Sequence, residues 1–308
     1  MKEYSGVGDI KEPLKNTVVT IGNFDGLHRG HQELFRLIKK KAADLNAATM
    51  AITFNPHPLK CIDPENHPPI ITLHEQKKEL IEKKGIDYLL TIPFSKEFAN
   101  LTAIEFIEDI LIKKLDVKAV AVGKDYMFGK KRQGNVALLK KYGEKFGFEV
   151  ILPDWIKIEK ERISSTLIRK AVQNGEMGKA RSMLGRFYQI KGTIVHGRHR
   201  GNKIGFPTAN LQLIDELCPK MGVYAVTAEL DSKFFQGVAN IGYSPTFEDH
   251  LFTIEVHLLG FEGDIYGETL KVNFIKRLRG EKKFNNIDEL SSQIAMDVDY
   301  AKAIIEKL

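Results

Sequence analysis

The feature that most constrains the fold of this chain is the decamer GNFDGLHRGH at residues 22–31, together with its flanks. The preceding run 17–21 is short and rich in β-branched residues, which is typical of a strand buried in a parallel sheet. Apolar residues recur at helical spacing in the stretch 34–45 that follows. The decamer is therefore predicted to be a strand-to-helix turn in an α/β sheet.

The same turn has the composition of a phosphate site. Gly26 and Gly30 allow the backbone to come close to a ligand. The start of a helix directs free N–H groups and the positive end of its dipole at one point, which favours an anion. His28 and His31 are three residues apart, so both can project from the first helical turn and donate to phosphate oxygens.

Length and charge set broad limits on the function. A chain of 308 residues is long enough for two domains, each with its own core. The formal charge of +6 suits anionic substrates such as ATP and also weak contact with nucleic acid. The charge alone therefore does not distinguish between these two kinds of partner. Cys61 and Cys218 are far apart and lack CxxC spacing, which indicates neither a disulfide framework nor a zinc site.

The N-terminal residues and the hydropathy of the chain indicate where it works. Residues 1–6 lack the apolar core of a signal peptide, and no apolar run approaches the length of a membrane span. We therefore expect a cytoplasmic protein with no membrane partner.

The first half of the chain alternates between strand-like and helical patterns. This alternation predicts a Rossmann-like parallel sheet with helices on both faces and ligands at the carboxyl ends of its strands. Residues 102–105 have the form of a capping box, so the third helix is predicted to restart there. The predicted strands are 17–23, 49–54, 88–93, 119–123 and 148–152, and the predicted helices are 30–45, 73–84, 98–115 and 136–146.

The second half of the chain changes character near residue 184. Its strand-like runs have turn residues but no helices between them, which predicts a small antiparallel β-barrel. The runs are 188–196, 222–230, 233–242, 252–259 and 269–276, and a closing helix at 286–308 is predicted to pack on the barrel. We therefore place domain boundaries at 1–184 and 185–308.

Three motifs in the first half carry a family resemblance. The decamer, residues 123–135 and the ISSTLIR segment at 163–169 resemble the adenylyltransferase half of the bacterial bifunctional riboflavin kinase/FMN adenylyltransferase (FAD synthetase) family. The resemblance implies that His28 and His31 act on the α- and β-phosphates of ATP in the transition state. It also implies that Arg169 is a catalytic residue which, with Ser165 and Thr166, holds the triphosphate.

The resemblance implies further contacts in this half. Gly22, Phe24 and Gly30 would complete the ATP site. The flavin would be bordered by two loops that follow strands, through Asn55, Pro56, Asp125 and Phe128. From the residues alone, the proline-containing loop can also be a simple turn, and the serines and threonine of the ISST segment are also good helix N-caps.

The second half resembles riboflavin kinase over residues 192–211, which end in the PTANL signature. The resemblance implies that Gly201 and Lys203 bind ATP phosphates, and that Thr208 and Asn210 offer oxygen ligands to Mg²⁺. It implies that Glu255 is the general base for the riboflavin 5′-hydroxyl. Alternation alone would make Glu255 an exposed strand carboxylate. Tyr243 and Arg277 are expected at the flavin in this domain.

These observations predict a bifunctional enzyme that phosphorylates riboflavin to FMN with ATP and then adenylylates FMN to FAD, releasing pyrophosphate. Its expected partners are the small molecules ATP, riboflavin and FMN, with Mg²⁺ as the metal and no nucleic acid. Two alternatives stay open at this point. One is a nucleotidyltransferase with another acceptor, and the other is a flavin- or RNA-binding regulator that keeps the fold.

Overall fold

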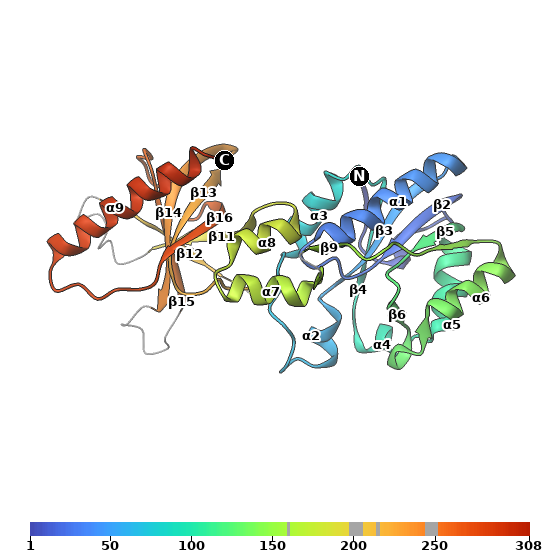
Figure 1. Ribbon diagram of the computed structural model, residues 1–308. Helices are drawn as coiled ribbons and strands as arrows, with labels where there is room; N and C mark the ends of the chain where they lie inside the picture. The colour runs from blue at the N-terminus through green and yellow to red at the C-terminus, as the bar shows by residue number, and fades with distance from the viewer. Residues whose placement is uncertain (159–160, 197–205, 214–215, 244–251) are drawn as a thin grey trace. The chain divides into compact units, whose positions relative to one another are not determined.

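The computed structural model describes residues 1–158, 161–196, 206–213, 216–243 and 252–308. The chain divides into two compact units (Figure 1). The first unit contains residues 1–68 and 74–163, and the second contains residues 69–73 and 164–308.

The first unit is built on a six-stranded sheet in which every pair of neighbours is parallel. Its central strand, β2, is buried over its whole length, as its β-branched sequence predicts. In sheet order the strands are β1 (Lys2–Tyr4), β4 (Tyr88–Pro93), β3 (Ala48–Asn55), β2 (Thr17–Ile21), β5 (Val117–Ala121) and β8 (Glu149–Ile151). The predicted parallel α/β sheet is confirmed.

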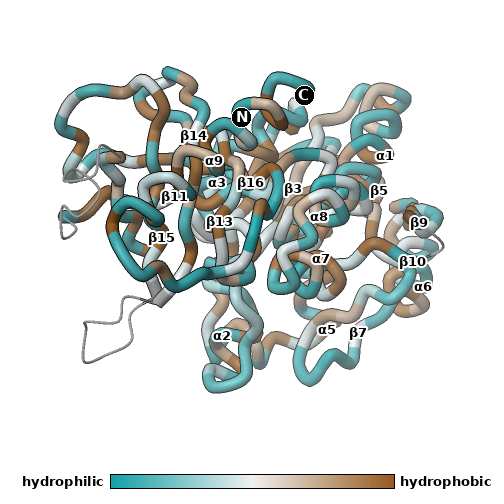
Figure 2. Tube along the Cα trace, turned by 60° about the vertical axis from the view of Figure 1, so that its left-hand side comes forward, coloured by the Kyte–Doolittle hydropathy of each residue, from teal (hydrophilic) through white to brown (hydrophobic). Residues whose placement is uncertain are grey.

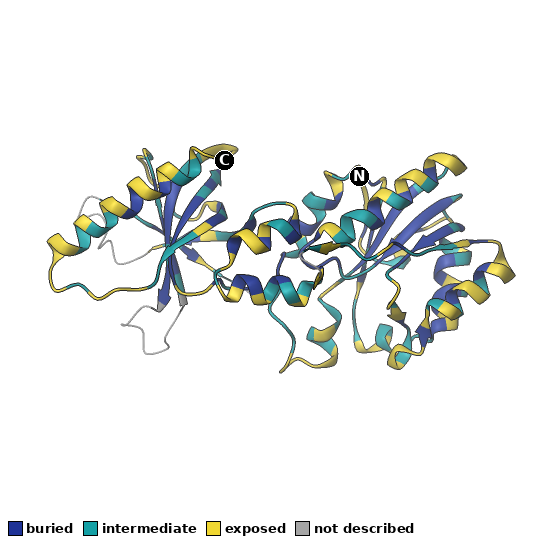
Figure 3. Cartoon of the chain, viewed as in Figure 1, coloured by how far each residue is buried: buried dark blue, intermediate teal, exposed yellow. Residues whose placement is uncertain are grey.

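Helices cover both faces of this sheet (Figure 1). Helices α1 (Arg29–Leu45) and α3 (His74–Glu82) contribute Leu34, Phe35 and Ile81 to one apolar layer. The π-helical segment η2 (Phe106–Lys114) and α6 (Val136–Phe146) contribute to the layer on the other face. The inner strands of the sheet are mostly buried and hydrophobic, while the outer sides of the helices are exposed and polar (Figures 2 and 3).

Short elements connect the long ones in this unit. A complete capping box at Thr102 and Glu105 starts α5 (Ala103–Glu105), so the predicted restart of the third helix is confirmed. The other short elements are η1 (Val7–Asp9), α2 (Pro58–Ile62), α4 (Lys96–Ala99), β6 (Met127–Phe128), η3 (Lys130–Arg132), β7 (Gly134–Asn135), β9 (Lys157–Ile158) and β10 (Glu161–Arg162).

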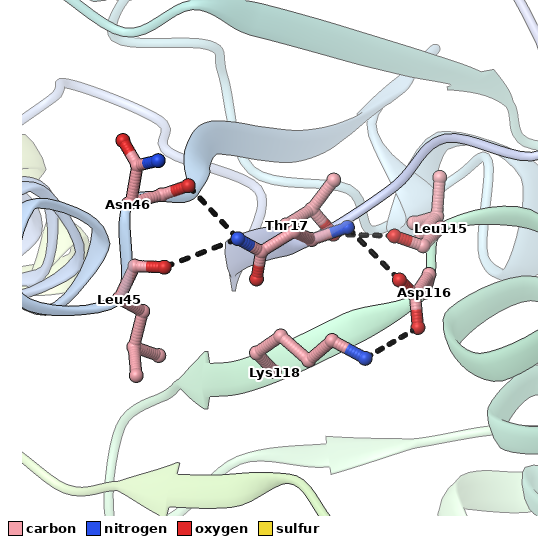
Figure 4. Close-up of polar contacts among 7 residues, drawn as sticks. Thr17, Leu45, Asn46, Leu115, Asp116 and Lys118 are labelled. Carbon is pink, nitrogen blue, oxygen red and sulfur yellow. Dashed lines mark hydrogen bonds and ion pairs between the residues drawn. The ribbon is translucent and has the colours of Figure 1, made fainter.

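A polar network fixes the amino end of β2, the edge opposite the decamer (Figure 4). The backbone N–H of Asn16 donates to Asp116 at 2.9 Å, and its side-chain amide donates to the carbonyl oxygens of Leu45 and Asn46, where α1 ends. Thr17 Oγ1 donates to the Leu115 carbonyl at 2.6 Å. Both ends of the strand–turn–helix unit are thereby held, which keeps the decamer in a fixed position on the sheet.

The second unit contains the predicted antiparallel barrel, which is closed. Around the barrel the strands are β11 (Tyr188–Val195), β12 (Ala209–Gln212), β15 (Phe252–Leu258), β14 (Lys233–Tyr243), β13 (Gly222–Leu230) and β16 (Thr269–Arg279). Helix α9 (Ile287–Ile305) packs Val298 and Ala301 against Val223 and Ala225 of β13, as predicted for the closing helix.

Helices α7 (Ser165–Gln173) and α8 (Met177–Leu184) pack within the second unit. Their backbone ties to that unit include the N–H of Lys220, which donates to the Val172 carbonyl. The division of the fold therefore falls before α7. The predicted domain boundary at 184, inferred from the change of sequence pattern there, stays a prediction.

Candidate active sites

The first candidate site is the decamer between β2 and α1. His28 is the N-cap of α1, and its Nδ1 accepts a hydrogen bond from the backbone N–H of His31 at 3.3 Å. Because an accepting Nδ1 carries no proton, the neutral His28 ring has its proton on Nε2. His28 therefore caps the helix with one nitrogen and carries its N–H on the other.

The two histidine rings lie against each other. Their centroids are 3.6 Å apart and their planes differ by 17°. A Cβ atom at Gly30 would lie 3.0 Å from Cε1 and 3.1 Å from Nδ1 of His28, tighter than an ordinary van der Waals contact. A side chain at position 30 would therefore push the His28 ring, which lies over this backbone, by a few tenths of an ångström.

Burial keeps His31 neutral. Desolvation lowers the pKa of His31 well below the ordinary value of 6.5, and the neighbouring His28 and Lys77 add to the effect. Its Nδ1 is buried and has no hydrogen-bond partner among the residues that the structure describes. Phe24 packs edge-on against the ring at 5.4 Å. The site thus offers neutral imidazoles as hydrogen-bond donors to an oxyanion.

The other residues predicted for ATP in this unit support the turn. Phe24 is completely buried, so its side chain holds His31 and Phe35 in place. A Cβ at Gly22 would lie 3.0 Å from the Phe24 ring. Their direct contact with ATP stays a prediction.

The predicted flavin residues lie on two loops of the first unit. Asn55 and Pro56 are exposed at the carboxyl end of β3 and are joined by a cis peptide bond. Asp125 forms an ion pair with Arg162 at 2.8 Å, and the Arg162 guanidinium lies 3.2 Å from the centre of the Trp155 ring.

Phe128, the fourth predicted flavin residue, is buried against Phe106 and stacks on Tyr126. Only a small part of its side chain is therefore left for a flavin.

The residues predicted to hold the triphosphate lie at the start of α7 in the second unit. Ser164 is the N-cap and accepts from Leu167 N–H at 3.3 Å, so Ser165 and Thr166 occupy the first helical turn. Arg169 Nε donates to the Pro69 carbonyl at 2.8 Å. This bond orients the guanidinium within its own unit.

The second candidate site is a polar row on the barrel. Residues on three neighbouring strands are in register, with Asn210 of β12 opposite Glu255 of β15, and Glu255 opposite Asn240 of β14. Paired residues project on the same face of a sheet. The alternating residues Ile254 and Val256 are buried, whereas Glu255 is half-buried. The predicted alternation along this strand is confirmed.

His257 links the PTAN segment to the strand that carries Glu255. Its Nδ1–H donates to the Pro207 carbonyl at 2.8 Å, and its ring packs edge-on against Phe206. Thr208 directly follows Pro207. This bond therefore holds Thr208 and Asn210 next to β15.

The remaining predicted residues of this site are partly outside the structure's description. Gly201 and Lys203 lie outside the described residues, and Tyr243 is described only as the last residue of β14. Arg277 donates two hydrogen bonds, from Nε and an Nη, to the Met221 carbonyl. Its contact with flavin stays a prediction.

The donor atoms near the PTAN segment suit Mg²⁺. The Thr208 hydroxyl and the Asn210 amide oxygen are hard ligands of the kind that Mg²⁺ prefers, usually beside waters and substrate phosphates. In the described part of the chain no three His, Cys, Asp or Glu side chains gather in a way that could hold a metal ion. Nor does any described helix have the length and apolar character needed to span a membrane.

Comparison with known proteins decides the family. Residues 10–167 match the FAD synthetase family model, and residues 184–305 match the riboflavin kinase model. The chain is 39% identical to the bifunctional riboflavin kinase/FMN adenylyltransferase of Haemophilus influenzae, covering 98% of this chain and 99% of that protein. The Escherichia coli protein of the same description is 40% identical, with 96% of each chain covered.

The chain belongs to the bifunctional riboflavin kinase/FMN adenylyltransferase family. A solved structure from Streptococcus pneumoniae, described as a macrolide-efflux protein, is 35% identical with a TM-score of 0.88 and covers 97% of this chain and 98% of that one. This likeness supports the two-part architecture, and the transport named in its description is not carried over to the family member described here.

Two residues of this riboflavin kinase/FMN adenylyltransferase were not assigned a role from sequence. His257 could have been found from its alternation with Glu255, which places both on one face of β15. Lys77 lies four residues before the buried Ile81 in α3, a spacing that places it on the buried face of the helix. The spacing therefore indicated where each side chain lies. It did not indicate a functional role, because a histidine or a lysine at such a position is common.

Proposed function

We propose how this bifunctional riboflavin kinase and FMN adenylyltransferase divides its two reactions along the chain. Residues 1–184 would adenylylate FMN, and residues 185–308 would phosphorylate riboflavin. The assignment is supported by two separate constellations, the histidine turn and the Asn210–Glu255–Asn240 row, each inside the segment that matches the corresponding family model.

In adenylyl transfer, an oxygen of the FMN phosphate attacks the α-phosphorus of ATP in line, and the bond to pyrophosphate breaks. The attacking phosphate is already ionised, so no base is needed. Catalysis then depends on positioning and on donors to the oxygens that gain charge. The Nε2–H of His28 and the neutral His31 ring would be two of these donors. Arg169, Ser165 and Thr166 would hold the triphosphate.

In riboflavin phosphorylation, the nucleophile is an alcohol and must lose a proton. Glu255 would accept that proton as the 5′-oxygen attacks the γ-phosphorus and ADP leaves. Asn210 and Asn240 flank the carboxylate on both neighbouring strands and would orient it. Thr208 and Asn210 would hold Mg²⁺, which when bound neutralises charge on the ATP phosphates.

The finer contacts complete the proposal. Gly22, Phe24 and Gly30 would support ATP in the first site, and Gly201 and Lys203 would bind ATP phosphates in the second. The flavin would lie against Asn55, Pro56, Asp125 and Phe128 in one domain and against Tyr243 and Arg277 in the other. Because both reactions consume ATP and flavin, we infer that the partners are small molecules and that the enzyme works in the cytoplasm.

The purified chain with riboflavin, ATP and Mg²⁺ tests the division, with products separated by chromatography. We expect FMN and then FAD. Glu255→Gln should abolish FMN formation but leave the conversion of added FMN to FAD intact, because only the alcohol needs a base. A double variant, His28→Ala with His31→Ala, should show the reverse pattern.

The outcomes separate the alternatives. Loss of both activities from either variant, with the fold intact by circular dichroism, would contradict the independence of the two sites. FMN without FAD from the unmodified protein would leave the first domain as a nucleotidyltransferase for another acceptor. Absence of both products would indicate a binding protein.

A further inference from the structure

A buried lysine lies near Asp25 and His31 of the histidine turn and has no role in the mechanism above. Lys77 of α3 is only 7% exposed, although lysine is almost never buried without a charged partner. Its surroundings come from three elements. Thr53 belongs to β3, Asp25 belongs to the decamer, and His31 belongs to α1.

The ammonium group of Lys77 is poorly satisfied. Among the described residues its only hydrogen bond is to Thr53 Oγ1, at 3.5 Å, the long limit for such a bond. No described carboxylate lies within ion-pair distance of Nζ, and Asp25 acts on it only through longer-range attraction. Since an ammonium carries three N–H donors, two of them are left for a ligand.

The position of Lys77 is tied to the phosphate-binding turn. Thr53, which accepts from Lys77, itself donates to the carbonyl oxygen of Asn23 at 3.2 Å. The hydrogen-bonded path therefore runs from α3 through β3 into the decamer. The ammonium is held at the carboxyl end of the strands, where parallel α/β sheets bind their ligands.

The charges around Lys77 favour an anion. Burial lowers the pKa of Lys77 to about 8, and Asp25 opposes this only in part. The titratable groups that face it are Asp25 from the decamer, His31 from α1 and His74 from α3, and Lys77 lowers the pKa of both histidines. Asp25 is thus the only carboxylate among these groups. A nearby phosphate would stabilise the protonated forms of Lys77 and of both histidines.

We propose that Lys77 is a further catalytic residue of adenylyl transfer, which donates to the ATP phosphate chain beside His28 and His31. The proposal rests on the assignment of FMN adenylylation to this turn. An ammonium adds full positive charge where the two neutral imidazoles offer only N–H dipoles, so its contribution grows as charge develops on the transferring phosphate.

The test is the pH dependence of kcat/KM for ATP in the conversion of FMN to FAD, from pH 6 to 10. The unmodified enzyme should lose activity about tenfold per pH unit above a pH near 8, as Lys77 becomes neutral. We call this decrease the alkaline limb of the pH profile. Phosphate groups of the substrates titrate near pH 6, so they do not produce the alkaline limb. The control reaction is riboflavin phosphorylation by the same preparations, which should show no such limb.

Three variants complete the test. Lys77→Met should lower kcat about a hundredfold, as loss of one oxyanion donor does, and should abolish the alkaline limb. Lys77→Arg keeps its charge throughout and should remove the limb while retaining more activity. Lys78→Met is the matched control, because Lys78 is the next residue of α3 and pairs with Glu3 at 2.7 Å. It should behave like the unmodified enzyme.

The results distinguish failure of this proposal from failure of the assigned function. One outcome is that Lys77→Met and Lys77→Arg keep both the alkaline limb and the rate, while the double histidine variant loses FAD formation. In that case the histidine turn is catalytic but Lys77 is not. If the unmodified enzyme makes no FAD, the assignment of the turn fails and this proposal falls with it. Should the methionine variant not fold, persistence of the limb in Lys77→Arg still overturns the proposal.

Discussion

Replacing Lys77 by methionine should change the stability of the protein in a way that depends on pH. The folded-state pKa is about 8, against 10.5 for the unfolded chain. Between these values the unfolded chain binds more protons than the folded one, so the free energy of unfolding of the unmodified protein rises as pH increases. Below pH 8 the buried ammonium costs stability that the neutral amine would not.

The size of the effect follows from linkage. A difference of one pKa unit corresponds to about 1.4 kcal/mol, so most of the effect develops between pH 7.5 and 10 and amounts to about 2 kcal/mol. Methionine has no proton to lose, and the two histidines whose pKa Lys77 lowers titrate below this pH range, so the titrations of the other groups cancel between pH 7.5 and 10. The unmodified protein should therefore gain about 2 kcal/mol relative to Lys77→Met over this range. Near pH 7.5 the loss of the buried charge should not make Lys77→Met less stable than the unmodified protein.

Urea denaturation of both proteins at pH 7.5 and 10, followed by circular dichroism, measures the difference. Lys78→Met is again the matched control, because ion pairing to Glu3 raises the pKa of Lys78. A raised pKa gives a stability contribution that is lost as pH rises, so this control should show a slope of the opposite sign or none. A Lys77→Met difference that does not change with pH would refute the burial argument.

Two further predictions follow from close contacts. Gly30→Ala should reduce FAD formation from FMN, because its Cβ would lie 3.0 Å from the His28 ring and displace it. Riboflavin phosphorylation measured on the same sample should be unchanged, and equal FAD rates would contradict the role of the glycine. His257→Ala removes the hydrogen bond to the Pro207 carbonyl and should lower the kcat of riboflavin phosphorylation about tenfold through misplaced Mg²⁺ ligands. Added Mg²⁺ should partly restore the rate, and adenylylation of added FMN provides the control.

The sequence predicts the long periodic elements well because their signals are local. The bounds of β4, β13 and α6 agree with prediction to the residue. The three-residue β1 and the strand β12 were not predicted. The first is too short to show a period, and the second follows a segment rich in glycine and basic residues.

The candidate sites show the same division between local and distant information. The histidine pair depends on a spacing of three residues on one helix, so its arrangement could be predicted from sequence. The Asn210–Glu255–Asn240 row depends on the register of three strands, which pattern alone does not fix. Lys77 reaches the decamer only because α3 packs on the face of the sheet that α1 also covers.

Under the proposed division of the two reactions, the two sites differ in residue type because their nucleophiles differ in protonation. A phosphate monoester is already an anion, so the histidine turn needs donors and positive charge, and a strong base there would only compete for the same donors. The turn fits this need, since the carboxylate of Asp25 is buried and the groups beside it are two imidazoles and an ammonium. An alcohol must be deprotonated, so the barrel site requires a carboxylate that stays accessible. Glu255, half-buried between the strands that carry Asn210 and Asn240, meets that requirement. Exchanging the residues of the histidine turn with those of the barrel site would therefore support neither reaction.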